Sequence, residues 1–134
     1  MATATIKYLG NLRCELTHTA SSNHFITDAP TDNHGKGEAF SPTDTMATSL
    51  AACMLTVMGI KANSLGFDLE GATAKVTKIM AAAPRRVSAI EVELNLQNKL
   101  DIKVMKVLEE IGRNCPVAKS LHPDLVQNIR FNWR

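Results

Sequence analysis

The sequence predicts an α+β fold in which an antiparallel sheet packs on a long, central, buried helix. Three observations lead to this prediction: short β-type bursts near the N-terminus, a long apolar stretch in the middle, and two later segments in which valines and isoleucines alternate with charges. The chain has 134 residues, of which 45% are hydrophobic and 21% charged. This composition suits one globular domain, and we expect a single domain over residues 1–134.

Residues 3–27 are expected to form two or three antiparallel strands. The bursts ATIKYL, LRCELTHT and HFIT are rich in β-type residues, and Gly10-Asn11 and residues 20–23 separate them with turn compositions. The next stretch, TDAPTDNHGKGEAF, is rich in Asp, Asn, Gly and Pro and has no periodicity. It predicts a loop that leads into a helix.

The apolar stretch predicts a helix from Pro42 to about Leu65. Ser41 can cap it, Pro42 suits the first helical position, and Asp44 stands where the acid of a capping box reaches back. Gly66 is a suitable stop. Such a helix is about 35 Å long, and small residues almost all round it indicate burial between layers. Its expected apolar side consists of Met46, Leu50, Cys53, Met54, Val57 and Ile60.

Two strands and a second helix are expected after the long helix. The segments DLEGATAKVTKIMAA and RRVSAIEVELNLQ predict a hairpin around Ala83-Pro84 with one face in water. A helix is expected from about Leu100 to Arg113, with Asp101 in its first turn, until Asn114-Cys115-Pro116 breaks it. A helical turn over residues 116–120 and a last strand, VQNIRFNW, complete the fold.

Charge and composition argue against several classes of protein. The net charge is only +2 and the basic residues are scattered, so the chain lacks the footprint of a nucleic-acid-binding protein. The start, MATATIKYLG, has no basic segment followed by an apolar run, and no stretch approaches the ~20 charge-free apolar residues of a membrane span. Three cysteines at these spacings suit neither a disulfide framework nor a CxxC motif. We therefore expect a soluble, cytoplasmic protein that binds neither nucleic acid nor membrane.

Two cysteines are candidates for chemistry. Cys53 lies on the apolar side of the helix, where a free cysteine is ordinarily a small core residue, and burial without a cation would leave it inert. Cys115 precedes Pro116 and can cap a short helix, where N–H groups and the helix dipole favour a thiolate, although it could equally be a plain cap. Two thiols that meet can form a redox pair through a sulfenic acid. Their spacing in the chain leaves open whether they meet.

A nucleophilic Cys53 would need a positive neighbour. Asp44 and Glu38 are acids that could hold an arginine in place, although each could also be only a cap or a loop residue. No histidine is paired in an H-x3-H pattern or combined with a C-x2-C pair, so we expect no metal. No P-loop, G-x-S-x-G or G-x-G-x-x-G occurs, and we expect no cofactor. The available cations are Arg13, Lys61, Arg85 and Arg86.

Three sequence features together identify a family resemblance. The run TDAPTDNHGKGEAFSPTDTMATSLAACMLTVMGIKA is followed by PRRV and then by NCPVAKSLHPDL. With a proline eleven residues before a cysteine and a later Cys-Pro-Val, the chain resembles the OsmC/Ohr family, the osmotically inducible protein C and organic hydroperoxide resistance proteins, from about Tyr8 to the final FNW. The resemblance implies an intertwined α+β homodimer with two sites at the subunit interface. It also implies thiol-dependent reduction of hydroperoxides without metal, haem or flavin.

The resemblance also assigns roles to individual residues. Cys53 resembles the peroxidatic cysteine, Cys115 the resolving cysteine, and Arg13 the arginine that stabilises the thiolate. Directly after the proline, the best hydroperoxidases carry an acid, whereas this sequence has Thr43. One residue later, Asp44 matches the acid of the broader OsmC-like branch.

Two hypotheses follow from these roles. The first is a peroxidase that passes through a Cys53 sulfenic acid and a Cys53–Cys115 disulfide and is recycled by an external dithiol, lipoyl-type or other. The second is a non-catalytic stress or small-molecule-binding protein with vestigial or sensory cysteines. Cys14 has no assigned role under either hypothesis.

Overall fold

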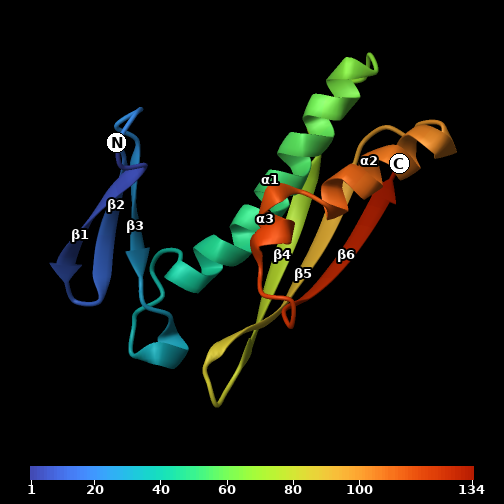
Figure 1. Cartoon of the computed structure of the whole chain (residues 1–134). Coiled ribbons are helices and arrows are strands. Elements are labelled where there is room, and N and C mark those ends of the chain that lie inside the picture. Colours follow the sequence, from blue (N-terminus) through green and yellow to red (C-terminus); the bar gives the residue numbers. More distant parts are fainter. The chain divides into compact units, whose positions relative to one another are not determined.

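The computed structural model describes all 134 residues, and they form two compact units, Met1–Met46 and Ala47–Arg134, each of which is described by itself. Strands and helices occur together along the chain, so the predicted α+β class is confirmed (Figure 1). The prediction of one domain over residues 1–134 stays a prediction.

The first unit contains a three-stranded antiparallel sheet in the order β1 (Ala4–Gly10), β2 (Arg13–His18) and β3 (His24–Asp28). The strands lie where the β-type bursts predict them. Ile6, Leu16 and Phe25 are partners in one row across the sheet, so they share a face. Ile6 and Phe25 are nonetheless exposed, at 62% and 45%. The sheet therefore presents an apolar face that this chain leaves largely uncovered.

The loop after β3 folds back through a short 3-10 turn, η1 (Thr31–Asn33). The Gly35 N–H donates to the Pro30 carbonyl at 2.9 Å, and the Gly37 N–H donates to the Ala29 carbonyl at 3.2 Å. Gly35 lies so close to the chain that a Cβ on it would be 1.7 Å from the Ala29 oxygen. Only glycine fits there, and the resulting turn returns Glu38 to the end of β3.

Helix α1 (Pro42–Ser64) begins at the predicted residue and has the predicted capping box. The Asp44 N–H donates to Ser41 Oγ at 3.0 Å, and the Ser41 N–H donates to Asp44 Oδ2 at 3.0 Å. The helix ends one residue before the predicted Leu65, and Gly66 follows with a positive φ of 85°. Both ends of the helix are therefore set by local sequence.

The buried side of α1 differs from the predicted one. Leu50 and Met54 are buried as expected, and Cys53 and Val57 are partly buried against the core, but Met46 is 36% and Ile60 66% exposed. Because this helix carries small apolar residues on nearly all of its sides, the period of its sequence does not indicate which side is buried. The residues buried on α1 are Ala47, Leu50, Ala51, Met54, Met58 and Ala62.

By length and composition alone, α1 could cross a membrane, with a mean hydropathy of 1.4 over its most apolar window. This revises the expectation that no stretch of the chain approaches a membrane span. The core helix of a soluble protein can have the same length and composition. In this chain, Leu50, Met54 and Met58 of α1 pack in the hydrophobic core.

The second unit contains a sheet in the order β4 (Thr73–Ala81), β5 (Arg86–Leu96) and β6 (Val126–Trp133). β4 and β5 form the predicted antiparallel hairpin. β5 and β6 are parallel, which corrects the expectation of a purely antiparallel sheet. The reason is the crossover through α2 (Ile102–Arg113) and α3 (Pro116–Ser120). It returns the chain to the end of the sheet where β5 begins, so β6 runs beside β5 in the same direction.

Two boundaries in this unit differ from prediction because polar side chains bond to nearby backbone. Residues 68–72 are not strand: Asp68 Oδ1 accepts the Glu70 N–H at 2.9 Å, and Gly71 has a φ of 89°. Asp101 caps α2 by accepting the Lys103 N–H at 3.0 Å, so the helix begins after it. The turn over 116–120 and the last strand are as predicted.

The core of the second unit lies between the buried side of α1, one face of β5, and the segment from α2 to α3. Figure 1 shows these helices gathered beside the sheet. Gly112 of α2 allows a close approach to α1, because a Cβ there would lie 2.8 Å from the Met58 sulfur. The β5 and α2–α3 members of the core include Ile90, Val92, Leu94, Leu96, Leu108, Cys115 and Ala118.

Candidate functional site

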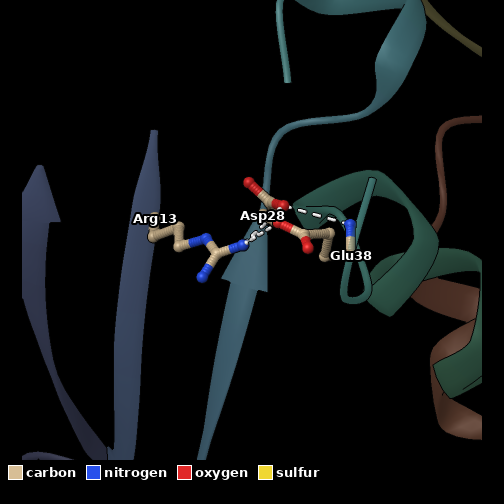
Figure 2. Close-up of polar contacts among 3 residues, drawn as sticks. All are labelled: Arg13, Asp28 and Glu38. Carbon is tan, nitrogen blue, oxygen red and sulfur yellow. Dashed lines mark hydrogen bonds and ion pairs between the residues drawn. The ribbon is translucent and has the colours of Figure 1, made fainter. Parts of the chain in front are cut away.

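In the first unit, Arg13 lies between two carboxylates. It is the first residue of β2 and the Cα partner of Asp28, the last residue of β3. Its Nη2 lies 2.6 Å from Glu38 Oε1 and 3.4 Å from Asp28 Oδ2. Figure 2 shows the two acids meeting the same guanidinium group. The suggestion that Glu38 could hold an arginine is therefore matched by a direct ion pair.

Asp28 is the buried member of this cluster, with 1% of its side chain exposed. Its Oδ2 accepts the Glu38 N–H at 3.1 Å, and its own backbone N–H donates to the Phe40 carbonyl at 3.0 Å. The Glu38 N–H holds the pKa of the Asp28 carboxyl below its usual value; burial opposes this shift, and Arg13 reinforces it. Asp28 is thus an ionised carboxylate fixed from several sides.

Sequence reasoning missed Asp28. Its position in TDAPTDN gave it the appearance of loop composition, since it begins a run of turn-forming residues. The signal that could have found it is the hairpin register: once β2 and β3 are aligned, Arg13 and Asp28 stand opposite each other, and opposite charges at facing positions stabilise a strand pair.

In the second unit, the structure brings Cys53 and Cys115 together. Cys115 is the N-cap of α3 and is 1% exposed, and its sulfur accepts the Ala118 N–H at 3.4 Å. Cys53 is half-buried on α1 and packs against the core that contains Cys115. Cys53 also contributes to the pKa shift of the Cys115 thiol, so the two side chains are neighbours. The fold therefore places two thiols that are distant in the chain in the same core, and their pairing stays a prediction.

The environment of Cys115 favours the thiol over the thiolate. Burial raises its pKa; the Ala118 and Val117 N–H groups oppose the rise, and the neighbouring Cys53 thiol adds to it. This corrects the expectation that the helix cap would favour a Cys115 thiolate, because desolvation outweighs the N–H groups. A protonated Cys115 suits the second step of a thiol reaction better than the first.

The other sequence candidates lie elsewhere. Asp44 takes part in the capping box of α1 with Ser41. Lys61 is in the last turn of α1, and Arg85 and Arg86 are exposed at the end of the β4–β5 hairpin. No group of three or more His, Cys, Asp or Glu side chains is placed to hold a metal ion.

The candidate residues thus fall into two groups, one in each unit. Arg13, Asp28, Glu38 and Asp44 belong to Met1–Met46, whereas Cys53 and Cys115 belong to Ala47–Arg134. Within its own unit, each group has a chemical function that it can perform. The first group holds a cation by two carboxylates, and the second places two thiols as neighbours in one core.

Comparison with known proteins gives one family and many similar structures. Residues 35–129 match the family model described as OsmC-like protein. A proposed osmotic stress induced and detoxification response protein from Psychrobacter arcticus is 52% identical, with a TM-score of 0.95 over 98% of this chain and 96% of that one. A search of curated proteins gave no match.

Two more distant structures share the fold. The organic hydroperoxide resistance protein OsmC of Legionella pneumophila is 18% identical, with a TM-score of 0.72 over 98% of each chain. The organic hydroperoxide resistance protein OhrB of Bacillus subtilis is 15% identical, with a TM-score of 0.68, again over 98% of each chain. At these identities the likeness concerns the fold alone.

Proposed function

Because this chain belongs to the OsmC-like protein family, we propose that it is a thiol-dependent peroxidase that reduces organic hydroperoxides through Cys53 and Cys115. The observation that supports this most is the proximity of the two thiols in the core of the second unit. The difference in burial between the two cysteines adds support. The half-buried Cys53 is accessible to a peroxide, while the buried Cys115 remains a thiol during the first step.

The first step oxidises Cys53. Its thiolate attacks the terminal oxygen of the hydroperoxide in line with the O–O bond, forming an S–O bond as the O–O bond breaks. The departing alkoxide takes up a proton and leaves as the alcohol. The sulfur is oxidised to sulfenic acid, and the peroxide is reduced by two electrons.

The second step forms the disulfide, and the third removes it. The Cys115 sulfur attacks the Cys53 sulfenic sulfur, the S–O bond breaks, and water leaves with the thiol proton. An external dithiol of the lipoyl type or another kind then exchanges with the disulfide, returning both cysteines to thiols and becoming a disulfide itself. No metal, haem or flavin enters this sequence of steps.

Arg13 is proposed to stabilise the Cys53 thiolate, with the two units brought into one site by assembly as a homodimer. The uncovered apolar face of the first sheet supports the assembly, because Ile6 and Phe25 there are 62% and 45% exposed. A second copy of the chain would cover this face, and the site would lie at the subunit interface.

Replacing Cys53 by serine tests the proposal. In a coupled assay with tert-butyl hydroperoxide and a dithiol, we expect Cys53→Ser to reduce turnover to the uncatalysed rate, because the hydroxyl cannot form a sulfenic acid. Cys14→Ser is the matched control, since Cys14 is also a half-buried cysteine but has no role in the steps above. Turnover that survives in Cys53→Ser would remove the proposal.

One observation favours a non-catalytic stress or binding protein as the second candidate. Thr43 stands directly after Pro42, where the best hydroperoxidases carry an acid, and its Oγ1 lies 3.2 Å from Ser41 Oγ. Alkylation of the native protein at neutral pH separates the two candidates. The peroxidase requires Cys53 to react faster than an ordinary free thiol, whereas vestigial cysteines would react no faster.

A further inference from the structure

We propose that Asp28 is a positioning residue that fixes Arg13 for the thiol chemistry, whereas Glu38 is an exchangeable second partner of the same guanidinium. The inference rests on the proposed function and assigns a part in it to a residue that the sequence did not indicate.

The first argument is that Asp28 is itself immobilised. Its backbone belongs to the β2–β3 ladder as the partner of Arg13, and its N–H donates to the Phe40 carbonyl at 3.0 Å. Its side chain is 1% exposed, and Oδ2 accepts both the Glu38 N–H at 3.1 Å and Arg13 Nη2 at 3.4 Å. A carboxylate held in this way offers the guanidinium a fixed acceptor.

The second argument is the contrast with Glu38. The Glu38 side chain is 60% exposed and comes from the loop rather than from a strand. Its 2.6 Å contact with Arg13 is shorter than that of Asp28, but an exposed ion pair is screened by water and loses side-chain entropy when it forms. Glu38 can therefore exchange its partner for water at little cost.

The third argument is the cost of leaving Asp28 alone. Removing the cation from a buried carboxylate is strongly unfavourable, because the charge then has no partner and little water. The pair formed by Arg13 and Asp28 therefore persists when the Glu38 side chain moves. The contacts with Asp28 and Glu38 both use Nη2, so the donors on Nη1 and Nε can serve a thiolate or a peroxide oxygen.

The mobility of the Arg13 side chain tests the proposal without peroxide. Nitrogen-15 relaxation of the Arg13 Nε–H, assigned by its loss in Arg13→Lys, is measured in the reduced full chain. We expect the wild type and Glu38→Gln to be ordered, and Asp28→Asn to fall to an order parameter below about 0.6, the range of flexible groups. Equal mobility in Asp28→Asn and Glu38→Gln, or no change in either, would overturn the assignment.

A kinetic measurement on the same variants links position to chemistry. With tert-butyl hydroperoxide, kcat/KM should fall at least tenfold further in Asp28→Asn than in Glu38→Gln. If the wild type shows no turnover, the proposed function fails, while the relaxation data still decide whether Asp28 positions Arg13. If turnover exists and Asp28→Asn keeps it with Arg13 ordered, the positioning role is wrong.

A second variant covers the case in which Asp28→Asn does not fold. Asp28→Glu keeps the charge but moves the carboxylate by one methylene, so the Arg13 Nε–H should become more mobile than in the wild type while the ion pair remains. Unchanged Arg13 mobility in Asp28→Glu would contradict a role that depends on the place of this carboxylate.

Discussion

Two buried groups, Asp28 and Cys115, show how surroundings set the charge of a side chain. Both are 1% exposed. Asp28 stays ionised because the Glu38 N–H and Arg13 together outweigh its burial, whereas Cys115 stays protonated because burial outweighs the Ala118 N–H. In the proposed reaction, the ionised Asp28 carboxylate keeps Arg13 paired. The protonated state of Cys115 delays its reaction until Cys53 has reacted.

The raised pKa of Cys115 predicts a stability effect at high pH. Its pKa is higher in the folded than in the unfolded chain, so its contribution to stability is fully present below the unfolded value of 9.0 and is lost as the pH rises through the folded value. Urea unfolding of the reduced wild type and of Cys115→Ala measures it. The wild type's free energy of unfolding, less that of the variant, should be constant below pH 9.0 and fall above it. A rise above that pH would contradict the shift.

At the residue scale, sequence predicted the chemistry of single positions better than their partners. Ser41 and Asp44 were predictable because both groups of a capping box lie within one turn. Asp28 was not, since its role depends on a strand register and on a loop that brings Glu38 back over ten residues. The proximity of Cys53 and Cys115 depends on how α3 and α1 pack in one core, which the spacing of the two residues in the sequence does not encode.

At the scale of elements, the loop between β3 and α1 is the segment on which the arginine cluster most depends. It turns tightly at Gly35, where the backbone passes against the Ala29 carbonyl. This turn allows the Glu38 N–H to reach Asp28 Oδ2 at 3.1 Å. The loop is therefore a structural part of the cluster as well as a connection.

Matched glycine substitutions test this part of the account. Gly35→Ala should lower the free energy of unfolding by about 1–3 kcal/mol, because its Cβ would collide with backbone and displace the loop. Gly59→Ala, in α1, should raise it by about 0.5–1 kcal/mol, because its Cβ meets nothing and alanine favours helix. Urea unfolding of both variants measures the two signs. Equal effects would show that the loop tolerates a side chain at residue 35.

Elements with strong local signals were predictable almost to the residue. The start of α1, the turn over 116–120 and the last strand agree with the sequence patterns. The parallel pairing of β5 and β6 was not predictable, because a strand pattern does not say which neighbour it joins or in which direction. The buried side of α1 was missed at Met46 and Ile60, because this helix is apolar on several sides.

At the scale of the whole molecule, the proposed homodimer predicts a measurable mass. Sedimentation equilibrium should give twice the chain mass of 14.6 kDa. Phe25→Glu should shift the mass toward one chain, because it places a charge on the apolar face of the first sheet. Thr5→Glu is the matched control, since Thr5 is exposed in a row on the opposite face and should leave the dimer intact. A monomeric wild type would contradict the assembly.

The central claim is that Cys53 and Cys115 act as one redox pair. Peptide mass spectrometry measures this most directly, after the reduced protein has reacted with one equivalent of tert-butyl hydroperoxide and been alkylated and digested. The account predicts a disulfide between the Cys53 and Cys115 peptides, with Cys14 alkylated, and a Cys53 sulfenic acid in Cys115→Ser. Recovery of all three cysteines as alkylated thiols, or a disulfide that instead contains Cys14, would contradict it.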